Sequence, residues 1–335
     1  YAVHPYPQKA RPGNDTREAW FDAWESDWGH LAERYPLIAT EIGWVREDGY
    51  NAHVPVIDNS GSYGPNLVRV MQDRGISWTA WIFDADWSPT MISDWDFTPT
   101  EQGRFFRWVM RRADEGRLSR AVIPAPRGVE YPWMSMQRWR DLHAGDMVVA
   151  QDGEASVLFV GDSITEGWPR SLWEKHYAPL GAANFGIGGD MTDNLLWRLH
   201  NGATGNLAPR VVVLMIGTNN LGLRQDSPGQ TAAGIEAVVS ELLRSFDEAE
   251  IVLLGILPTG ETADSELRLR VTEVNRLVAE LGNRERVSFH DIGAAFLQAD
   301  GSISTAIMAD FRHPTEKGYA VFAEQLDPIL ESVLD

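Results

Sequence analysis

The stretch Val157-Leu158-Phe159-Val160-Gly161-Asp162-Ser163-Ile164-Thr165 joins a short apolar run to a Gly-Asp-Ser turn. The run predicts a buried strand over 156–160, because continuous apolar runs of this length are typical of sheets covered on both faces. A helix follows the turn, so the Ser163 hydroxyl should lie at the carboxyl end of a strand, where open α/β sheets bind ligands. The same turn is also compatible with a simple helix cap, since Asp and Ser cap many helices.

The residues after this stretch alternate between apolar runs and helical patterns. Strands are expected at 183–187, 210–216, 251–257 and 286–291, with helices at 191–200, 229–246, 265–281 and 314–333. Apolar strands separated by amphipathic helices indicate a parallel sheet with helices on both faces. We therefore predict a three-layer α/β domain, which we place at residues 153–335.

The residues before this domain divide into two parts. A linker is predicted at 118–152, with a short helix at 133–142 and a loop at 144–153, because several prolines and glycines interrupt the pattern there. Residues 1–117 predict three βα units, with strands at 1–4, 37–42 and 77–83 and helices at 15–35, 63–74 and 100–112. Three such units are too few for a closed barrel and rather few for an independent sheet.

Three further motifs follow predicted strands or precede the last predicted helix. Glycines in 184–190 permit a close backbone approach and leave the amide of Gly189 available as a donor. Asn219 follows another strand, and its side-chain amide could donate to an oxyanion. Asp310 stands three residues before His313, a spacing that lets a carboxylate orient an imidazole. Each motif has a simpler alternative, respectively a Gly-rich turn, an Asx turn and a helix entry.

Together the four motifs supply every role needed for acyl transfer through a serine. Ser163 is the predicted nucleophile, His313 the base and Asp310 the residue that orients it. The amides of Ser163 and Gly189, with the side chain of Asn219, are the predicted oxyanion hole.

These four motifs resemble those of the SGNH (GDSL-type) serine esterases, and the resemblance covers about residues 124–335. It is strongest for the platelet-activating-factor acetylhydrolase-like branch, through 184–190, Leu196-Trp197-Arg198-Leu199 and 211–221. The resemblance implies a flavodoxin-like sheet with strand order 2-1-3-4-5 and no metal or cofactor. A Gly-x-Ser-x-Gly sequence is absent around Ser163, which argues against an α/β-hydrolase.

Residues 1–115 resemble the carboxyl-terminal part of a glycoside hydrolase family 5 barrel. Val3-His4-Pro5-Tyr6, Ile38-Ala39-Thr40-Glu41-Ile42-Gly43 and Trp78-Thr79-Ala80-Trp81 carry this resemblance. Glycoside hydrolysis needs two carboxylates, and the Asn-Glu pair that would provide the second one does not occur before the linker. We therefore expect Glu41 to be non-catalytic and to be held by its neighbours His4 and Tyr6.

Nine of the 14 tryptophans lie between Trp20 and Trp108. They predict either a bulky core or a surface that stacks on sugar rings, with Trp44, Trp81 and Trp87 as possible sugar contacts. A partial barrel leaves open strand edges that another surface tends to cover. This favours a structural role for the segment and a homo-oligomer, most simply a dimer.

Charge and composition exclude several classes of partner. The formal net charge of −19 disfavours nucleic acid and anionic membranes, and no apolar run approaches the length of a membrane span. Cysteine is absent, which excludes disulfides and thiolate nucleophiles. The chain does not begin with Met, so we expect that an upstream segment was removed; a secreted or periplasmic protein is predicted, with a cytoplasmic one as the alternative.

The predicted function is removal of small acyl groups, foremost acetyl, from carbohydrate, with an acyl ester or acetylated oligosaccharide as the substrate. The carbohydrate part rests on the fused glycosidase-like segment. A lipid or aryl esterase, such as a lysophospholipase or a platelet-activating-factor-type deacetylase, is the main alternative. A carbohydrate-binding protein with an inactive esterase is the third.

Overall fold

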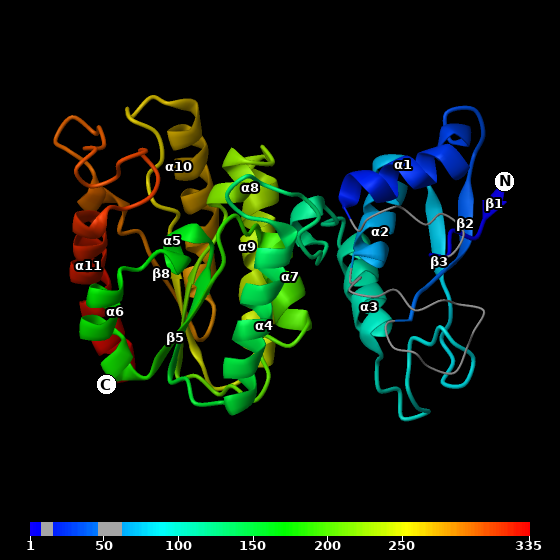
Figure 1. Ribbon diagram of the computed structural model, residues 1–335, viewed down its shortest axis with the longest axis horizontal. Coiled ribbons are helices and arrows are strands. Elements are labelled where there is room, and N and C mark those ends of the chain that lie inside the picture. The colour runs from blue at the N-terminus through cyan, green and yellow to red at the C-terminus, as the bar shows by residue number, and fades with distance from the viewer. Residues whose placement is uncertain (8–15, 46–61) are drawn as a thin grey trace. The chain divides into compact units, whose positions relative to one another are not determined.

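The computed structural model describes residues 1–7, 16–45 and 62–335 (Figure 1). The chain forms two compact units, Tyr1–Met136 and Gln137–Asp335. Their division falls inside the predicted linker at 118–152.

The second unit is built on one five-stranded sheet. Its strands are β4 (Val157–Gly161), β5 (Ala182–Gly186), β6 (Val211–Met215), β7 (Glu250–Leu254) and β8 (Val287–His290). All pairs are parallel and the order is β5-β4-β6-β7-β8, which is the predicted 2-1-3-4-5 order. The carboxyl ends of the strands therefore share one edge of the sheet, and β4 lies inside it, between β5 and β6.

Helices cover both faces of this sheet, which confirms the three-layer prediction (Figure 1). The helices are α4 (Met136–Asp152), α5 (Ser163–Glu166), α6 (Arg170–His176), α7 (Thr192–His200), α8 (Thr218–Gly222), α9 (Pro228–Ser245), α10 (Glu266–Val278) and α11 (Glu316–Leu334). The helices α6 and α11 lie on one side of the sheet, whereas α4, α7 and α9 lie on the other.

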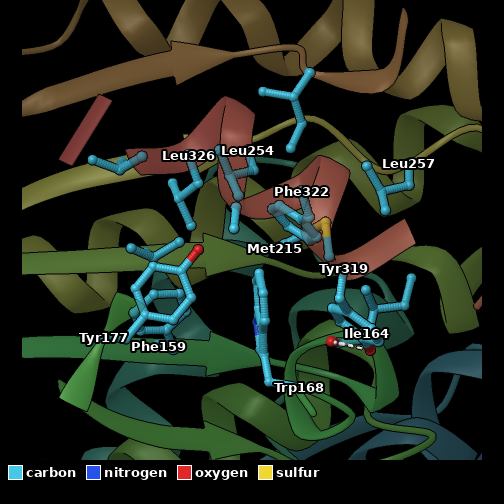
Figure 2. Close-up of a cluster of buried hydrophobic side chains, with 14 of the residues drawn as sticks. Phe159, Ile164, Trp168, Tyr177, Met215, Leu254, Leu257, Tyr319, Phe322 and Leu326 are labelled. Atoms are coloured by element: carbon cyan, nitrogen blue, oxygen red, sulfur yellow. Dashed lines mark hydrogen bonds between the residues drawn. The ribbon is translucent and has the colours of Figure 1, made fainter. Parts of the chain in front are cut away.

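Alternate strand residues pack against α11 to form the core of one face (Figure 2). Phe159, Met215 and Leu254 from three strands contact the apolar side of α11, where Phe322 and Leu326 lie. Burial of such side chains contributes about 1.5–3 kcal/mol each to folding. This packing holds β4 in place and so fixes where its carboxyl end, and the turn that follows, are located.

Helix α4 differs from the prediction for the linker. We expected a short helix at 133–142 and a loop at 144–153, but one helix runs from Met136 to Asp152. Gly145 favours a loop, yet it lies within this helix at an open position, where a Cβ would have no atom within 4 Å. The buried ring of Trp139 packs against Trp197 of α7, and this tertiary contact outweighs the weak helix propensity of glycine.

The first unit has a small parallel sheet in the order β1-β2-β3. Its strands are β1 (Ala2–Val3), β2 (Ile38–Ile42) and β3 (Ser77–Ala80), and its helices are α1 (Arg17–Asp27), α2 (Tyr63–Asp73) and α3 (Glu101–Asp114). The alternation of strand and helix agrees with the predicted βα units. In this unit the helix α1 is shorter than predicted, because it ends at Asp27 and a 3-10 turn at Gly29–Leu31 follows.

Aromatic residues dominate the core of the first unit. The tryptophans Trp20, Trp24, Trp28 and Trp44 are all buried there, and the rings of all but Trp28 contact the ring of Tyr63. The bulky-core interpretation therefore holds for these four tryptophans. Over the described part of the chain, no helix combines the length and the apolar character needed to cross a bilayer.

Candidate active site

The turn after β4 places Ser163 at the first position of α5. Asp162 caps this helix, with its Oδ1 accepting a hydrogen bond from the Ile164 amide at 3.0 Å. Gly161 is required by close packing, because a Cβ there would lie 2.2 Å from Thr165 Oγ1 and 2.4 Å from the Met215 carbonyl oxygen. Ser163 is thus held at the carboxyl end of the sheet, where the sequence placed it.

Ser163 lies within hydrogen-bond distance of His313, which comes from the loop before α11. The Ser163 Oγ and His313 Nε2 atoms are 2.9 Å apart. A neutral imidazole nitrogen at this distance accepts the hydroxyl proton when its own proton is on the other nitrogen. The structure therefore brings the predicted nucleophile and base together.

Asp310 fixes which nitrogen of His313 carries the proton. Its Oδ2 lies 2.6 Å from Nδ1, and an ionised carboxylate only accepts, so Nδ1 is the protonated nitrogen. Burial raises the pKa of Asp310, but hydrogen bonds from the ring and backbone amide of His313 outweigh it and leave that pKa below its ordinary value. Asp310 is thus ionised at neutral pH and leaves Nε2 free to accept.

The loop that carries this pair has an unusual backbone. Phe311 has φ +57, a left-handed conformation that costs a non-glycine residue roughly 1 kcal/mol. Two contacts hold it: the amide of Gly260 donates to the Phe311 carbonyl at 2.9 Å, and the Phe311 ring packs against the core. The kink turns the chain so that Asp310 and the ring of His313 face each other.

The predicted oxyanion donors come from three separate segments. Ser163 begins α5, so its N–H has no acceptor within the helix. Gly189 stands in a turn with φ +77, and within 62–335 its amide meets no backbone or side-chain acceptor. Asn219 is buried in α8 and donates one of its two Nδ2 protons to the Asp190 carbonyl at 3.0 Å, which leaves the second proton for another acceptor.

Side-chain hydrogen bonds hold these segments in position. The Glu166 carboxylate accepts from the Gly188 amide at 2.6 Å, which joins α5 to the turn that contains Gly189. The Asn220 side chain bonds both the amide and the hydroxyl of Thr192, each at 3.0 Å, which joins α8 to α7. Rigid supports of this kind are what an oxyanion site requires, because its donors must already be in place.

A buried charge network lies beneath the turn at Gly189. Asp190 accepts from Trp139 Nε1 at 2.6 Å and from Arg198 Nε at 2.8 Å, and Arg198 also bonds Asp146 at 3.0 Å. Burial raises the pKa of Asp146 to about 7, although Arg198 opposes this shift. Burial likewise raises the pKa of Asp162 to about 6. Two carboxyl groups beside the site are therefore harder to ionise than usual.

The tryptophans predicted as sugar contacts divide into two kinds. The prediction is wrong for Trp44, which is 3% exposed and packs edge-on against Tyr63, Phe105 and Phe106. Trp87 is 58% exposed, and the half-buried Trp81 meets it edge-on at 5.6 Å between ring centroids. The surface around these two rings remains a candidate for sugar binding.

Glu41 in β2 has the two neighbours that the sequence suggested. Tyr6 donates its hydroxyl proton to Glu41 Oε2 at 3.0 Å, and His4 Nδ1 lies 3.6 Å from the same oxygen. His4 also contacts Thr40 through Nε2 at 2.8 Å. The carboxylate is thus engaged within the first unit.

Several supporting residues had no predicted role. Asp190, Arg198 and Asn220 all lie in stretches that carry the family resemblance, but their contacts were not foreseen. Arg198 offered one signal, since a charged residue between Trp197 and Leu199 in a helix against a sheet needs a buried partner. The identity of that partner depends on the loop at Gly188 and could not be read from spacing.

Comparison with known proteins identifies the family. The model of the GDSL-like lipase/acylhydrolase family matches residues 159–321. Platelet-activating factor acetylhydrolase IB subunit alpha2 of Homo sapiens and of Rattus norvegicus is 38% identical over 200 residues, which cover 59% of this chain and 86% of the relative. The chain belongs to the GDSL-like lipase/acylhydrolase family, whose members are ester-hydrolysing enzymes.

Solved structures resemble each part of the chain. A GDSL-like lipase of Bacteroides thetaiotaomicron has a TM-score of 0.50 at 20% identity, covering 58% of this chain and 97% of its own, which supports the fold. A β-glucanase of Saccharophagus degradans, in complex with cellotetraose, is 58% identical with a TM-score of 0.32; the match covers 34% of this chain, in its N-terminal part. This chain spans only 33% of that glucanase.

Proposed function

We propose that the second unit hydrolyses short acyl esters, foremost acetyl esters, through Ser163, His313 and Asp310. The observation that carries this proposal is the line of contacts from Ser163 Oγ to His313 Nε2 at 2.9 Å and from Nδ1 to Asp310 at 2.6 Å. The acetyl group is supported by the 38% identity to acetylhydrolase subunits.

The proposed reaction proceeds in two halves. Ser163 Oγ attacks the ester carbonyl carbon while His313 Nε2 takes its proton, and the carbonyl oxygen becomes an oxyanion held by the amides of Ser163 and Gly189 and by Asn219 Nδ2. The oxyanion collapses, the alcohol leaves with the proton from His313, and an acyl-serine remains. Water, deprotonated by His313, then attacks the acyl-serine and releases the carboxylic acid and Ser163.

Hydrolysis of 4-nitrophenyl esters from acetyl to dodecanoyl tests the reaction and the acyl length. We expect turnover to fall steeply beyond butyryl and to disappear in Ser163→Ala, whose circular dichroism spectrum should match that of the unchanged protein. Turnover by a folded Ser163→Ala protein would refute the proposal.

A second candidate is deacetylation of a lipid of the platelet-activating-factor type, favoured by the names of the 38% identical relatives. It shares the chemistry and differs in the alcohol. A rate that holds or rises with acyl length, or hydrolysis of an acetylated lysophospholipid faster than of acetylated xylo-oligosaccharides, would favour the lipid.

For the first unit we propose a non-catalytic role in holding carbohydrate for the esterase. The exposed ring of Trp87, beside Trp81, supports this role, because aromatic faces stack on sugar rings. Titration calorimetry with cello- and xylo-oligosaccharides is the test, with Trp87→Ala expected to weaken binding. Trp133→Ala is the matched control, since Trp133 is 52% exposed and stacks on Tyr131 elsewhere in this unit. Equal binding by both variants would contradict the role.

We further propose that the chain forms a homodimer and is exported from the cytoplasm. The open edges of a three-stranded sheet support association, since unpaired edges tend to be covered. Sedimentation of the full chain over a concentration series, and its location in fractionated cells, test these two statements. A monomer at every concentration would refute the dimer.

A further inference from the structure

Arg312 lies between the two residues that the proposed function uses as base and orienter. Its backbone amide donates to Asp310 Oδ1 at 3.1 Å. Its guanidinium lies over the end of α8, since a Cβ on Gly222 would be 3.2 Å from Nη2 and 3.5 Å from Cζ. Helix α8 also carries Asn219, the proposed oxyanion donor. The Arg312 side chain therefore extends from the loop of His313 to the helix of Asn219.

The guanidinium of Arg312 forms neither an ion pair nor a side-chain hydrogen bond within the continuous stretch 62–335. Two other arginines of this unit are engaged through several donors: Arg224 bonds Asp193 and Asp226, and Arg268 bonds three carbonyl oxygens. A half-buried guanidinium whose donors are unused by the described residues has the geometry to receive a carboxylate in a bidentate pair.

The positive charge of Arg312 lies in strongly negative surroundings. The chain has a formal net charge of −19, and carboxylates such as Asp162, Asp310 and Glu166 lie around the site. Such a field repels an anionic substrate unless a local positive charge offsets it. Burial raises the pKa of Asp162; the hydrogen bond from the Ile164 amide opposes this rise most, and the positive charge of Arg312 adds a smaller opposing effect.

We propose that Arg312 binds a carboxylate on the alcohol part of the substrate, so that the site selects acetyl esters of anionic carbohydrates, that is, of sugar acids. This inference rests on the proposed esterase function. An acetyl group is too short to carry a second charged group, so the anion belongs to the alcohol. Arg312 then acts as a specificity-determining residue, which pairs with the carboxylate while the neighbouring ester reaches Ser163.

The test compares two aryl acetates that differ only in charge, 3-acetoxybenzoate and 3-acetoxybenzamide. The ratio of their kcat/KM values is measured for the unchanged protein, Arg312→Gln and Arg312→Lys. We expect Arg312→Gln to lower the benzoate-to-benzamide ratio about tenfold, the scale of one charge-assisted hydrogen bond. Arg312→Lys should retain most of the ratio, and added salt should lower it in the unchanged protein but not in Arg312→Gln.

Arg276→Gln is the matched control, because Arg276 pairs with Glu273 on the exposed side of α10 and its loss changes the net charge equally. Its ratio should equal that of the unchanged protein. An unchanged ratio in Arg312→Gln, or an equal loss for both esters, overturns the proposal. If Ser163→Ala still hydrolyses both esters, the proposed function itself fails. If Ser163→Ala is inactive but the kcat/KM ratio is the same in Arg312→Gln as in the unchanged protein, only the role of Arg312 fails.

Discussion

Asp310 contacts His313 twice, through Oδ2 to the ring Nδ1 at 2.6 Å and through Oδ1 to the backbone amide at 2.7 Å. One carboxylate thus fixes both the backbone of the histidine and the rotation of its ring. Oδ2 orients the imidazole ring, whereas Oδ1 holds the backbone of the loop. A substitution that changes only the atom facing Nδ1 can therefore alter the protonation of the ring without altering the loop.

Replacing Asp310 by Asn tests that separation. The amide oxygen continues to accept from the backbone, so the amide nitrogen faces Nδ1 and favours the tautomer with a proton on Nε2, which cannot accept from Ser163. We expect kcat to fall about 10³-fold or more, with the fold unchanged, and His313→Ala to lose a similar factor because the residues act as a unit. Steady-state hydrolysis of 4-nitrophenyl acetate measures both; a loss below tenfold in either variant would contradict the assignment.

The raised pKa of Asp162 predicts a pH-dependent stability. The pKa rises from 3.8 to about 6 on folding, so the folded state keeps a proton that the unfolded chain releases, and stability falls as pH rises from about 4 through 6. Asp162→Asn lacks this titration and still offers an oxygen to the Ile164 amide. Relative to the unchanged protein, the variant should therefore be more stable at pH 8 than at pH 4 by up to about 3 kcal/mol. Urea unfolding at the two pH values measures this difference, and an equal effect at both would refute it.

Arg198 compensates the carboxylates of the buried Asp190 and the partly buried Asp146, and its loss should be severe. Arg198→Met leaves Asp190 and Asp146 without their cation, and breaking a buried pair in this way costs about 3–5 kcal/mol. Trp139→Phe removes a single donor to Asp190 and should cost less, about 1–3 kcal/mol. Guanidinium unfolding curves rank the two variants; the reverse order would show that the cation is not the main partner of Asp190.

Gly161 and Gly145 form a matched pair of glycine substitutions. Gly161→Ala forces a Cβ against Thr165 and the Met215 carbonyl, so we expect a loss of about 1–3 kcal/mol and reduced turnover, because α5 with Ser163 must shift. Gly145→Ala meets no atom within 4 Å and lies in α4, where alanine should add up to about 1 kcal/mol. Thermal unfolding and 4-nitrophenyl acetate hydrolysis check both. Full activity in Gly161→Ala would show that the turn tolerates displacement.

Local patterns in the sequence predicted the parallel sheet well, because apolar runs such as 211–215 and the Gly-Asp-Ser turn report burial and a strand end directly. The strand order came from the resemblance to the SGNH esterases. They also selected Ser163, Asp310 and His313, since the residue types and spacings reflect the chemistry. Long-range contacts were not predictable in this way. Helix α4 depends on Trp139 meeting Trp197, Trp44 is buried by residues far along the chain, and the position of Arg312 over Gly222 appears only when the loop of Phe311 folds back.

The 150 residues that separate Ser163 from His313 give the site a particular relation to protein synthesis. A ribosome has produced the proposed nucleophile and all five strands of this sheet before it reaches His313, and α11, which completes one face of the core, follows the histidine. Every nascent chain that ends between these two residues therefore contains the proposed nucleophile without its proposed base, and we expect it to be inactive on esters. Onset of ester hydrolysis would therefore report that the segment with His313 and α11 has docked on the sheet.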